Sequence, residues 1–176
     1  MDTTPVYFQL LDLPVAYDID AALLAERYRE RQQAVHPDRH AGSGPGERLR
    51  AVQFSSDLNA AYQCLRYPLS RAIYLLDCAG HRASADRTVK QDMVFLQQQM
   101  HWREALADMA EADKPQQVLD RLLDECQRAV EATETSFREA YAAQDWDAAM
   151  HSVARWQFLE KFRAELDAAE ERLMDG

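Results

Sequence analysis

The chain has 176 residues, 47% of them hydrophobic, and a formal net charge of -10. This length suits one or two small domains with real cores. Nucleic acids and anionic lipids reward a basic surface, so the acidic balance argues against both as general partners and favours another protein. The N-terminus lacks a basic region followed by an apolar one, and no apolar run reaches membrane-spanning length, so we expect a cytoplasmic protein without a membrane partner.

The composition favours helix. Only 5 Gly and 6 Pro interrupt a sequence rich in Ala, Leu, Glu, Gln and Arg, and these residues prefer helical conformations. We therefore predict an all-α protein. Cys64, Cys78 and Cys126 are odd in number and lack paired metal-ligand spacing. They predict neither a disulfide framework nor a zinc site, and we expect no metal and no cofactor.

Two helices are expected at the start of the chain. The first is short, because Thr4 and Pro5 can open it and Pro14 ends the apolar run that follows. The second is predicted to begin after a cap at Asp20 and to continue to about Val35.

Two more helices complete a predicted first domain, residues 1–80. Residues 41–46 are rich in Gly and Pro and are expected to form a connector. A third helix follows from Glu47 to about Tyr67 and can pack antiparallel on the second, because its apolar residues recur every three or four positions. Pro68 then opens a short fourth helix. The second and third helices form a helical finger with a loop at its tip.

That loop contains His36, Pro37 and Asp38. Pro37 disfavours helical geometry at the residue before it, so the second helix should end here and the loop side chains should lie on a turn. A His and an Asp close together could indicate general base chemistry. The loop has no evident nucleophile, glycine cradle or metal set, so we do not predict an enzyme. Docking on a partner is the preferred interpretation, and a simple helix end is the alternative.

A second helical domain is predicted in residues 88–176, after a linker at residues 81–87 whose residues are small or polar. Three antiparallel helices with short connections make a three-helix bundle. They are expected from Thr88 to Lys114, from Pro115 to about Ala143, and onward from a cap at Asp145.

The first bundle helix carries two overlapping patterns. The first pattern is an apolar stripe, whose members mostly recur every three or four residues. The members of this stripe are Val89, Met93, Leu96, Met100, Leu106 and Met109. Leu96, Met100, Glu104 and Asp108 are also spaced at four residues and so share one side of the helix. Without further context, Leu96 and Met100 would be interpreted as bundle core. Phe158 breaks the main apolar stripe of the last helix.

Charge separates the two halves. Residues 1–80 carry 8 basic and 10 acidic side chains, and the remainder carries 12 and 20, so the excess is -2 against -8. A solvated acidic face is the ordinary explanation for the second half. Complementarity to a basic partner is the functional alternative.

Several segments carry a resemblance to a known family. The second helix, the His36-Pro37-Asp38 loop and positions in the third and fourth helices together resemble a J-domain. Those positions are Asn59 to Tyr62, Leu65, Pro68, Arg71, Ala72 and Tyr74 to Leu76. Further segments are similar to the HscB family, the J-type co-chaperones of iron–sulfur cluster assembly. They are Tyr7 to Pro14, Phe95 and Leu96, Arg103 and Glu104, and Trp146 to Ala149. The resemblance covers nearly the whole chain.

The resemblance implies two partners. The first is an HscA-like chaperone of the DnaK type, whose ATP hydrolysis the J-domain stimulates. A basic face on the second helix would meet an acidic surface of that chaperone. The residues implied in chaperone binding are His36, Pro37, Asp38, Arg27, Arg29 and Arg39.

The second implied partner is an IscU-like scaffold on which iron–sulfur clusters are assembled. In the family, apolar residues with acidic neighbours on the second domain bind this scaffold. The residues implied here are Leu96, Met100, Glu104, Asp108 and Phe158. With this implied role, Leu96, Met100 and Phe158 are expected to be partly exposed in the free protein. The resemblance therefore implies a co-chaperone that delivers the scaffold to the chaperone during cluster assembly or transfer. The alternative is a J-domain adaptor for a different client protein, or a purely structural helical adaptor.

Overall fold

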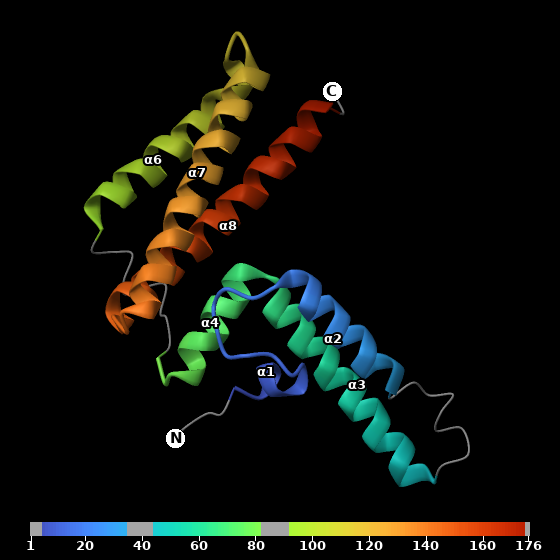
Figure 1. The fold of residues 1–176 in the computed structure, drawn as a ribbon. Helices are drawn as coiled ribbons and strands as arrows, with labels where there is room; N and C mark the ends of the chain where they lie inside the picture. The colour runs from blue at the N-terminus through green and yellow to red at the C-terminus, as the bar shows by residue number, and fades with distance from the viewer. Residues whose placement is uncertain (1–4, 35–43, 82–91, 175–176) are drawn as a thin grey trace. The chain divides into compact units, whose positions relative to one another are not determined.

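The structure, a computed structural model, describes residues 5–34, 44–81 and 92–174. Within these ranges it consists of helices and their connections and contains no strand, which confirms the predicted all-α class. The chain divides into two compact units, Met1–Gly80 (unit 1) and His81–Gly176 (unit 2). Figure 1 shows the helices of both units.

Unit 1 contains four described helices. They are α1 (Val6–Leu10), α2 (Ala21–Ala34), α3 (Pro45–Arg66) and α4 (Pro68–Cys78). Helices α2 and α3 lie side by side and form the two arms of a finger (Figure 1). Apolar side chains from all four helices and the turn after α1 form the core of this unit. Its most buried members are Phe8, Leu11, Leu24, Leu58, Ala61, Leu65, Ala72, Leu75 and Leu76.

The predicted cap of α2 is confirmed. The Asp20 Oδ1 atom accepts hydrogen bonds from the backbone N–H groups of Ala22 at 2.8 Å and Leu23 at 3.1 Å. These N–H groups have no partner within the helix, so the carboxylate stabilises its first turn.

Three predicted helix boundaries in unit 1 were wrong. Pro5 is the N-cap of α1 and not a first-turn residue, and α1 ends at Leu10. Asp12 has a φ of 52°, a conformation that cannot continue a helix, so this residue and not Pro14 turns the chain. Helix α3 begins at Pro45, inside the predicted connector, because a proline in the first turn loses no hydrogen bond that the helix needs.

Arg71 joins α3 to α4 at the centre of unit 1. This side chain is only 8% exposed, and its Nη1 donates a hydrogen bond to the carbonyl oxygen of Leu65 at 2.6 Å. Leu65 lies in the last turn of α3, where carbonyl groups lack helical partners and attract positive charge. The guanidinium also lies 5.0 Å from the centre of the Tyr17 ring. Arg71 therefore caps α3 from inside the core.

Unit 2 is the predicted three-helix bundle. Its described elements are α6 (Met93–Asp108), the 3-10 turn η3 (Met109–Glu111), α7 (Pro115–Ala142) and α8 (Trp146–Met174). Helices α7 and α8 pack along one another, and Gln144, with a φ of 55°, makes the tight turn between them. The predicted cap of α8 is confirmed, because Asp145 Oδ1 accepts a hydrogen bond from Ala148 N–H at 3.1 Å.

The apolar residues of α6 divide between the core and the surface, and the expected exposure of Leu96 and Met100 is confirmed. Phe95, Trp102 and Met109, spaced seven residues apart, are the buried residues of this segment. Met93 and Met100 point outward, with 65% and 63% of their surface exposed. The line through Phe95, Trp102 and Met109 stays on one side of the helix, because seven residues span close to two turns. Val89 lies outside the described residues.

Of the predicted linker, only His81 lies within the described residues. Its ring stacks on Trp146 at the start of α8, with ring centres 4.9 Å apart. In the ranges that the structure describes, no helix is long and apolar enough to cross a bilayer.

The role of Arg71 gives a stability prediction. Arg71→Met keeps most of the aliphatic stem but removes the charge that caps α3, so a buried carbonyl loses its partner. We expect the free energy of unfolding of unit 1 to fall by about 2–3 kcal/mol. Urea unfolding followed by circular dichroism measures this, with Arg50→Met on the exposed side of α3 as the control. Equal stability of the two variants would contradict the capping role.

Candidate functional site

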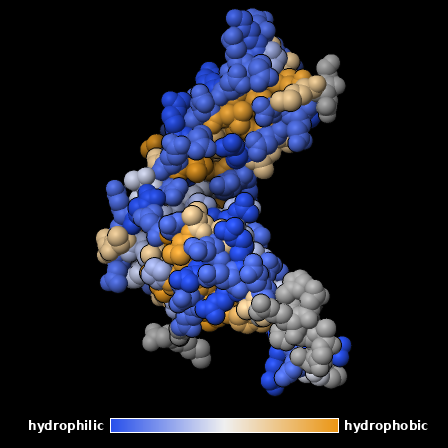
Figure 2. Space-filling model, turned by 45° about the vertical axis from the view of Figure 1, so that its right-hand side comes forward, coloured by the Kyte–Doolittle hydropathy of each residue, from blue (hydrophilic) through white to orange (hydrophobic). Residues whose placement is uncertain are grey.

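An apolar surface lies on α6 of unit 2. Leu96 is half-buried, Met100 is 63% exposed, and Glu104 and Asp108 are exposed. These four residues form a row that winds slowly around the helix, with the apolar pair toward its N-terminal end and the acidic pair toward its C-terminal end. Figure 2 shows apolar residues gathered in a strip along unit 2. We call Leu96, Met100, Glu104, Asp108 and Phe158 the client face.

Phe158 contributes to the client face from α8. It is half-buried and packs against the core of unit 2. Its ring meets Phe95 edge to face, with centres 5.4 Å apart, and stacks on Phe162 at 6.2 Å. Phe158 therefore has two environments, because one part of the ring supports the bundle while another part remains accessible.

Arg103 also belongs to this region, although the sequence did not predict it as a site residue. Its guanidinium lies 5.8 Å from the centre of the Phe158 ring, and its Nη2 lies 3.7 Å from a carboxylate oxygen of Glu165 on α8. The signal was present in the spacing, because Arg103 follows Leu96 by seven residues and so lies on the same side of the helix. Met93, exposed and seven residues before Met100, was missed in the same way.

The N-terminus of α6 is held to α8 by Asp92. This side chain caps the helix by accepting the Phe95 N–H at 2.9 Å. The same carboxylate lies 3.8 Å from Nη1 of Arg155 and 3.9 Å from Nε2 of His151. The Arg155 guanidinium in turn lies 4.3 Å from the centre of the Phe95 ring. The start of the client face is therefore positioned by a cap, an ion pair and a cation–π contact.

The predicted chaperone-binding residues are only partly described. His36, Pro37, Asp38 and Arg39 lie outside the described residues. The remaining two candidates lie on α2.

Arg27 and Arg29 differ in their surroundings. Arg27 pairs with Glu30 at 3.3 Å and with Asp12 at 3.8 Å, and its side chain is 37% exposed. Arg29 is exposed and donates from Nε to the carbonyl oxygen of Ala25 at 3.2 Å. Asp12 follows α1 and is far from Arg27 in sequence, so the sequence did not predict this ion pair. The positive charge of Arg27 is partly neutralised, and Arg29 carries the freer charge.

The three cysteines are free thiols. Burial is the main cause that raises the pKa of Cys64 to about 11 and that of Cys126 to about 11. Burial also raises the pKa of Cys78. A protonated thiol is a poor nucleophile and a poor metal ligand. Among the described residues, no three His, Cys, Asp or Glu side chains are grouped so that they could hold a metal ion.

The two units define a class of protein: an all-α molecule with a helical finger in one unit and a three-helix bundle with an exposed apolar side in the other. Comparison with known proteins makes the class specific. Residues 91–167 match the family described as "HSCB C-terminal oligomerisation domain". The chain is 39% identical to "Co-chaperone protein HscB homolog" of Shewanella denitrificans, over 96% of this chain and 99% of that protein. It is 35% identical to "Co-chaperone protein HscB" of Proteus mirabilis, over 97% and 98%.

Solved structures agree. "Chaperone HscB from Vibrio cholerae" superposes with a TM-score of 0.88 and 32% identity, covering 95% of this chain and 99% of that one. The human co-chaperone protein HscB superposes with a TM-score of 0.86 and 25% identity, covering 97% and 84%. The chain therefore belongs to the HscB co-chaperone family, as its resemblance implied.

The raised thiol pKa values predict slow alkylation. At pH 8 the native protein should leave Cys126 unmodified by iodoacetamide, because this residue is buried and its thiol stays protonated below its pKa of about 11. In urea all three cysteines should react, since unfolding restores the ordinary pKa. Mass spectrometry of the modified protein measures both states. Rapid modification of native Cys126 would contradict this account of its environment.

Proposed function

We propose that this protein is a co-chaperone that binds an IscU-like iron–sulfur scaffold and delivers it to an HscA-like chaperone of the DnaK type. In this role it stimulates ATP hydrolysis by the chaperone in the cytoplasm, during cluster assembly or transfer. It is an accessory protein and turns over no substrate itself. The observation that carries the proposal is the exposed apolar surface of α6 in a member of the HscB family.

The client face has the composition of a protein-binding surface. Met100 exposes most of its side chain to water, and Leu96 and Phe158 expose part of theirs. Burying such a side chain completely is worth about 1.5–3 kcal/mol. The apolar residues can therefore supply most of the affinity for the scaffold. Glu104 and Asp108 lie beside them and would mainly affect the rate of association and its dependence on salt.

Chaperone binding is proposed for unit 1. His36, Pro37 and Asp38 would couple the co-chaperone to ATP hydrolysis. Arg29, whose charge has no recorded carboxylate partner among the described residues, would steer the encounter with an acidic chaperone surface. Arg27 would contribute less, because Asp12 and Glu30 already oppose its charge, and Arg39 extends the basic set toward the loop.

The two proposed sites lie on different units of one chain. A scaffold bound to unit 2 is thereby tethered to the chaperone that unit 1 engages. Tethering raises the effective concentration of the scaffold at the chaperone, to the millimolar range for short connections. Delivery therefore requires no catalytic group in the co-chaperone.

The proposal predicts a loss of scaffold affinity when the exposed apolar atoms of α6 are removed. The double variant Leu96→Ala, Met100→Ala should bind an IscU-like scaffold about 10- to 100-fold more weakly than the wild type, because two partly buried contacts are lost. Isothermal titration calorimetry measures the affinity. Phe158 is left intact because its removal would also weaken the bundle core.

The matched control is the double variant Val94→Ala, Met174→Ala. Both side chains are at least as exposed as Met100, with 76% and 74% of their surface accessible, but neither belongs to the client face. This control should bind the scaffold like the wild type. Equal affinity of the two double variants would contradict the proposed client face. A collapsed melting temperature of the first variant would show that Leu96 and Met100 act as core residues.

A further inference from the structure

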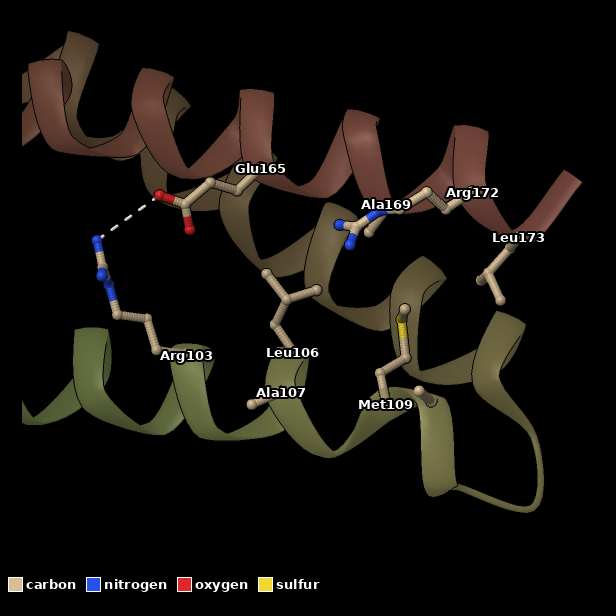
Figure 3. Close-up of a pocket in the computed structure, with 9 residues that line it drawn as sticks. Arg103, Leu106, Ala107, Met109, Glu165, Ala169, Arg172 and Leu173 are labelled. Carbon is tan, nitrogen blue, oxygen red and sulfur yellow. Dashed lines mark ion pairs between the residues drawn. The ribbon is translucent and has the colours of Figure 1, made fainter. Parts of the chain in front are cut away.

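A groove continues the client face toward the C-terminal ends of α6 and α8. It has a volume of about 630 Å³ and lies between the C-terminal halves of α6 and α8. This volume lies within the range of about 300–1,000 Å³ typical of ligand clefts. Figure 3 shows that the two helices form its long walls. The groove therefore suits a segment of polypeptide that lies along the helices.

Small and apolar residues create the groove. Ala107 on α6 and Ala169 on α8 leave space between the helices, and Leu106, Met109 and Leu173 supply an apolar lining. Met109 is nearly buried, whereas Leu106 and Leu173 are half-buried and pack against the core. An apolar side chain of a partner would find complementary contacts here.

Two arginines give the groove a charge that differs from its surroundings. Arg103 is paired with the carboxylate of Glu165. Arg172 is the other cation that lines the groove. The recorded hydrogen bond of Arg172 runs from Nε to the carbonyl oxygen of Ala168 at 3.0 Å. Within residues 92–174, no carboxylate forms a recorded ion pair with its guanidinium. The groove thus presents an available cation in a half of the chain whose net charge is -8.

The groove and the client face share a residue. Arg103 lies against the Phe158 ring of the client face and also lines the groove, where it pairs with Glu165. A protein bound on Leu96, Met100 and Phe158 would therefore have the groove next to it, on the same two helices. Because the groove and the client face are continuous, a segment of the bound client is the nearest polypeptide that can occupy the groove.

We propose that the groove is a second contact site for the client, and that it binds a client segment in which a carboxylate stands next to an apolar side chain. The carboxylate pairs with Arg172, and the apolar side chain packs against Leu106 and Leu173. The proposal rests on the proposed function and extends it, because it assigns to the client an acidic and apolar segment in addition to the surface that covers Met100.

Two variants test the groove, with an IscU-like scaffold as the probe. Ala107→Trp fills the groove from an exposed position, and Arg172→Glu reverses its available charge. Each should weaken scaffold binding about tenfold, measured by calorimetry. The Arg172→Glu change makes unit 2 more acidic, which would strengthen the binding of basic client groups that contact unit 2 outside the groove. A loss of affinity in Arg172→Glu therefore points to an acidic group in the groove.

Each variant has a matched control. Ala164→Trp places the same side chain at an exposed alanine of α8 that does not line the groove. Arg128→Glu reverses an exposed arginine of α7 whose Nε also bonds a carbonyl one turn earlier, that of Asp124 at 3.2 Å. Both controls should bind the scaffold like the wild type. Circular dichroism checks that all four variants keep the fold. If Ala107→Trp does not fold, Arg172→Glu and its control test the groove by themselves.

The outcomes separate the groove from the proposed function. Wild-type affinity in both groove variants overturns the groove as a client site and leaves the client face standing. A wild-type protein that does not bind the scaffold overturns both proposals. A second copy of this chain is the other candidate occupant of the groove. Analytical sedimentation tests it by measuring self-association of the protein. Self-association of the wild type that Ala107→Trp abolishes would assign the groove to that copy and overturn the client assignment.

Discussion

A chain of four aromatic rings holds the client face in place. Phe95 and Trp102 project from α6, and Phe158 and Phe162 project from α8. Trp102 stacks on Phe162 with ring centres 5.3 Å apart, and Phe158 meets both Phe95 and Phe162. Each such pair adds about 0.5–1.5 kcal/mol beyond the apolar area that it buries. The Trp102 Nε1 also donates to Glu125 on α7 at 2.8 Å, so α6 is fixed to both neighbouring helices.

This constraint determines what unit 2 can offer to a partner. Once Phe95 and Trp102 are buried, the geometry of the helix turns Met100 outward. The same packing brings Arg103 next to Phe158 and leaves space beside Ala107 and Ala169. The client face and the groove are therefore two consequences of one packing arrangement. A surface on a rigid bundle loses little conformational freedom on binding, which favours affinity.

The sequence predicted the fold class, the order of the helices and the caps at Asp20 and Asp145, because these depend on local residue preferences. The sequence did not predict which side of α6 faces the core. Apolar residues occur on several sides of this helix, so spacing alone could not distinguish the buried Trp102 from the exposed Met100. The pairing of Arg27 with Asp12 and the contact of Arg103 with Phe158 depend on tertiary packing, which no local pattern encodes. The chaperone-binding loop stays a prediction, since His36 lies outside the described residues.

The most direct test of the central claim is the steady-state ATP hydrolysis of an HscA-like chaperone, measured with this protein in the presence and absence of an IscU-like scaffold. The account predicts that the wild type raises the rate and that scaffold raises it further. His36→Gln should abolish both effects while scaffold binding, measured by calorimetry, stays unchanged. Near-normal stimulation by His36→Gln, or a rate that scaffold does not alter, would contradict the account.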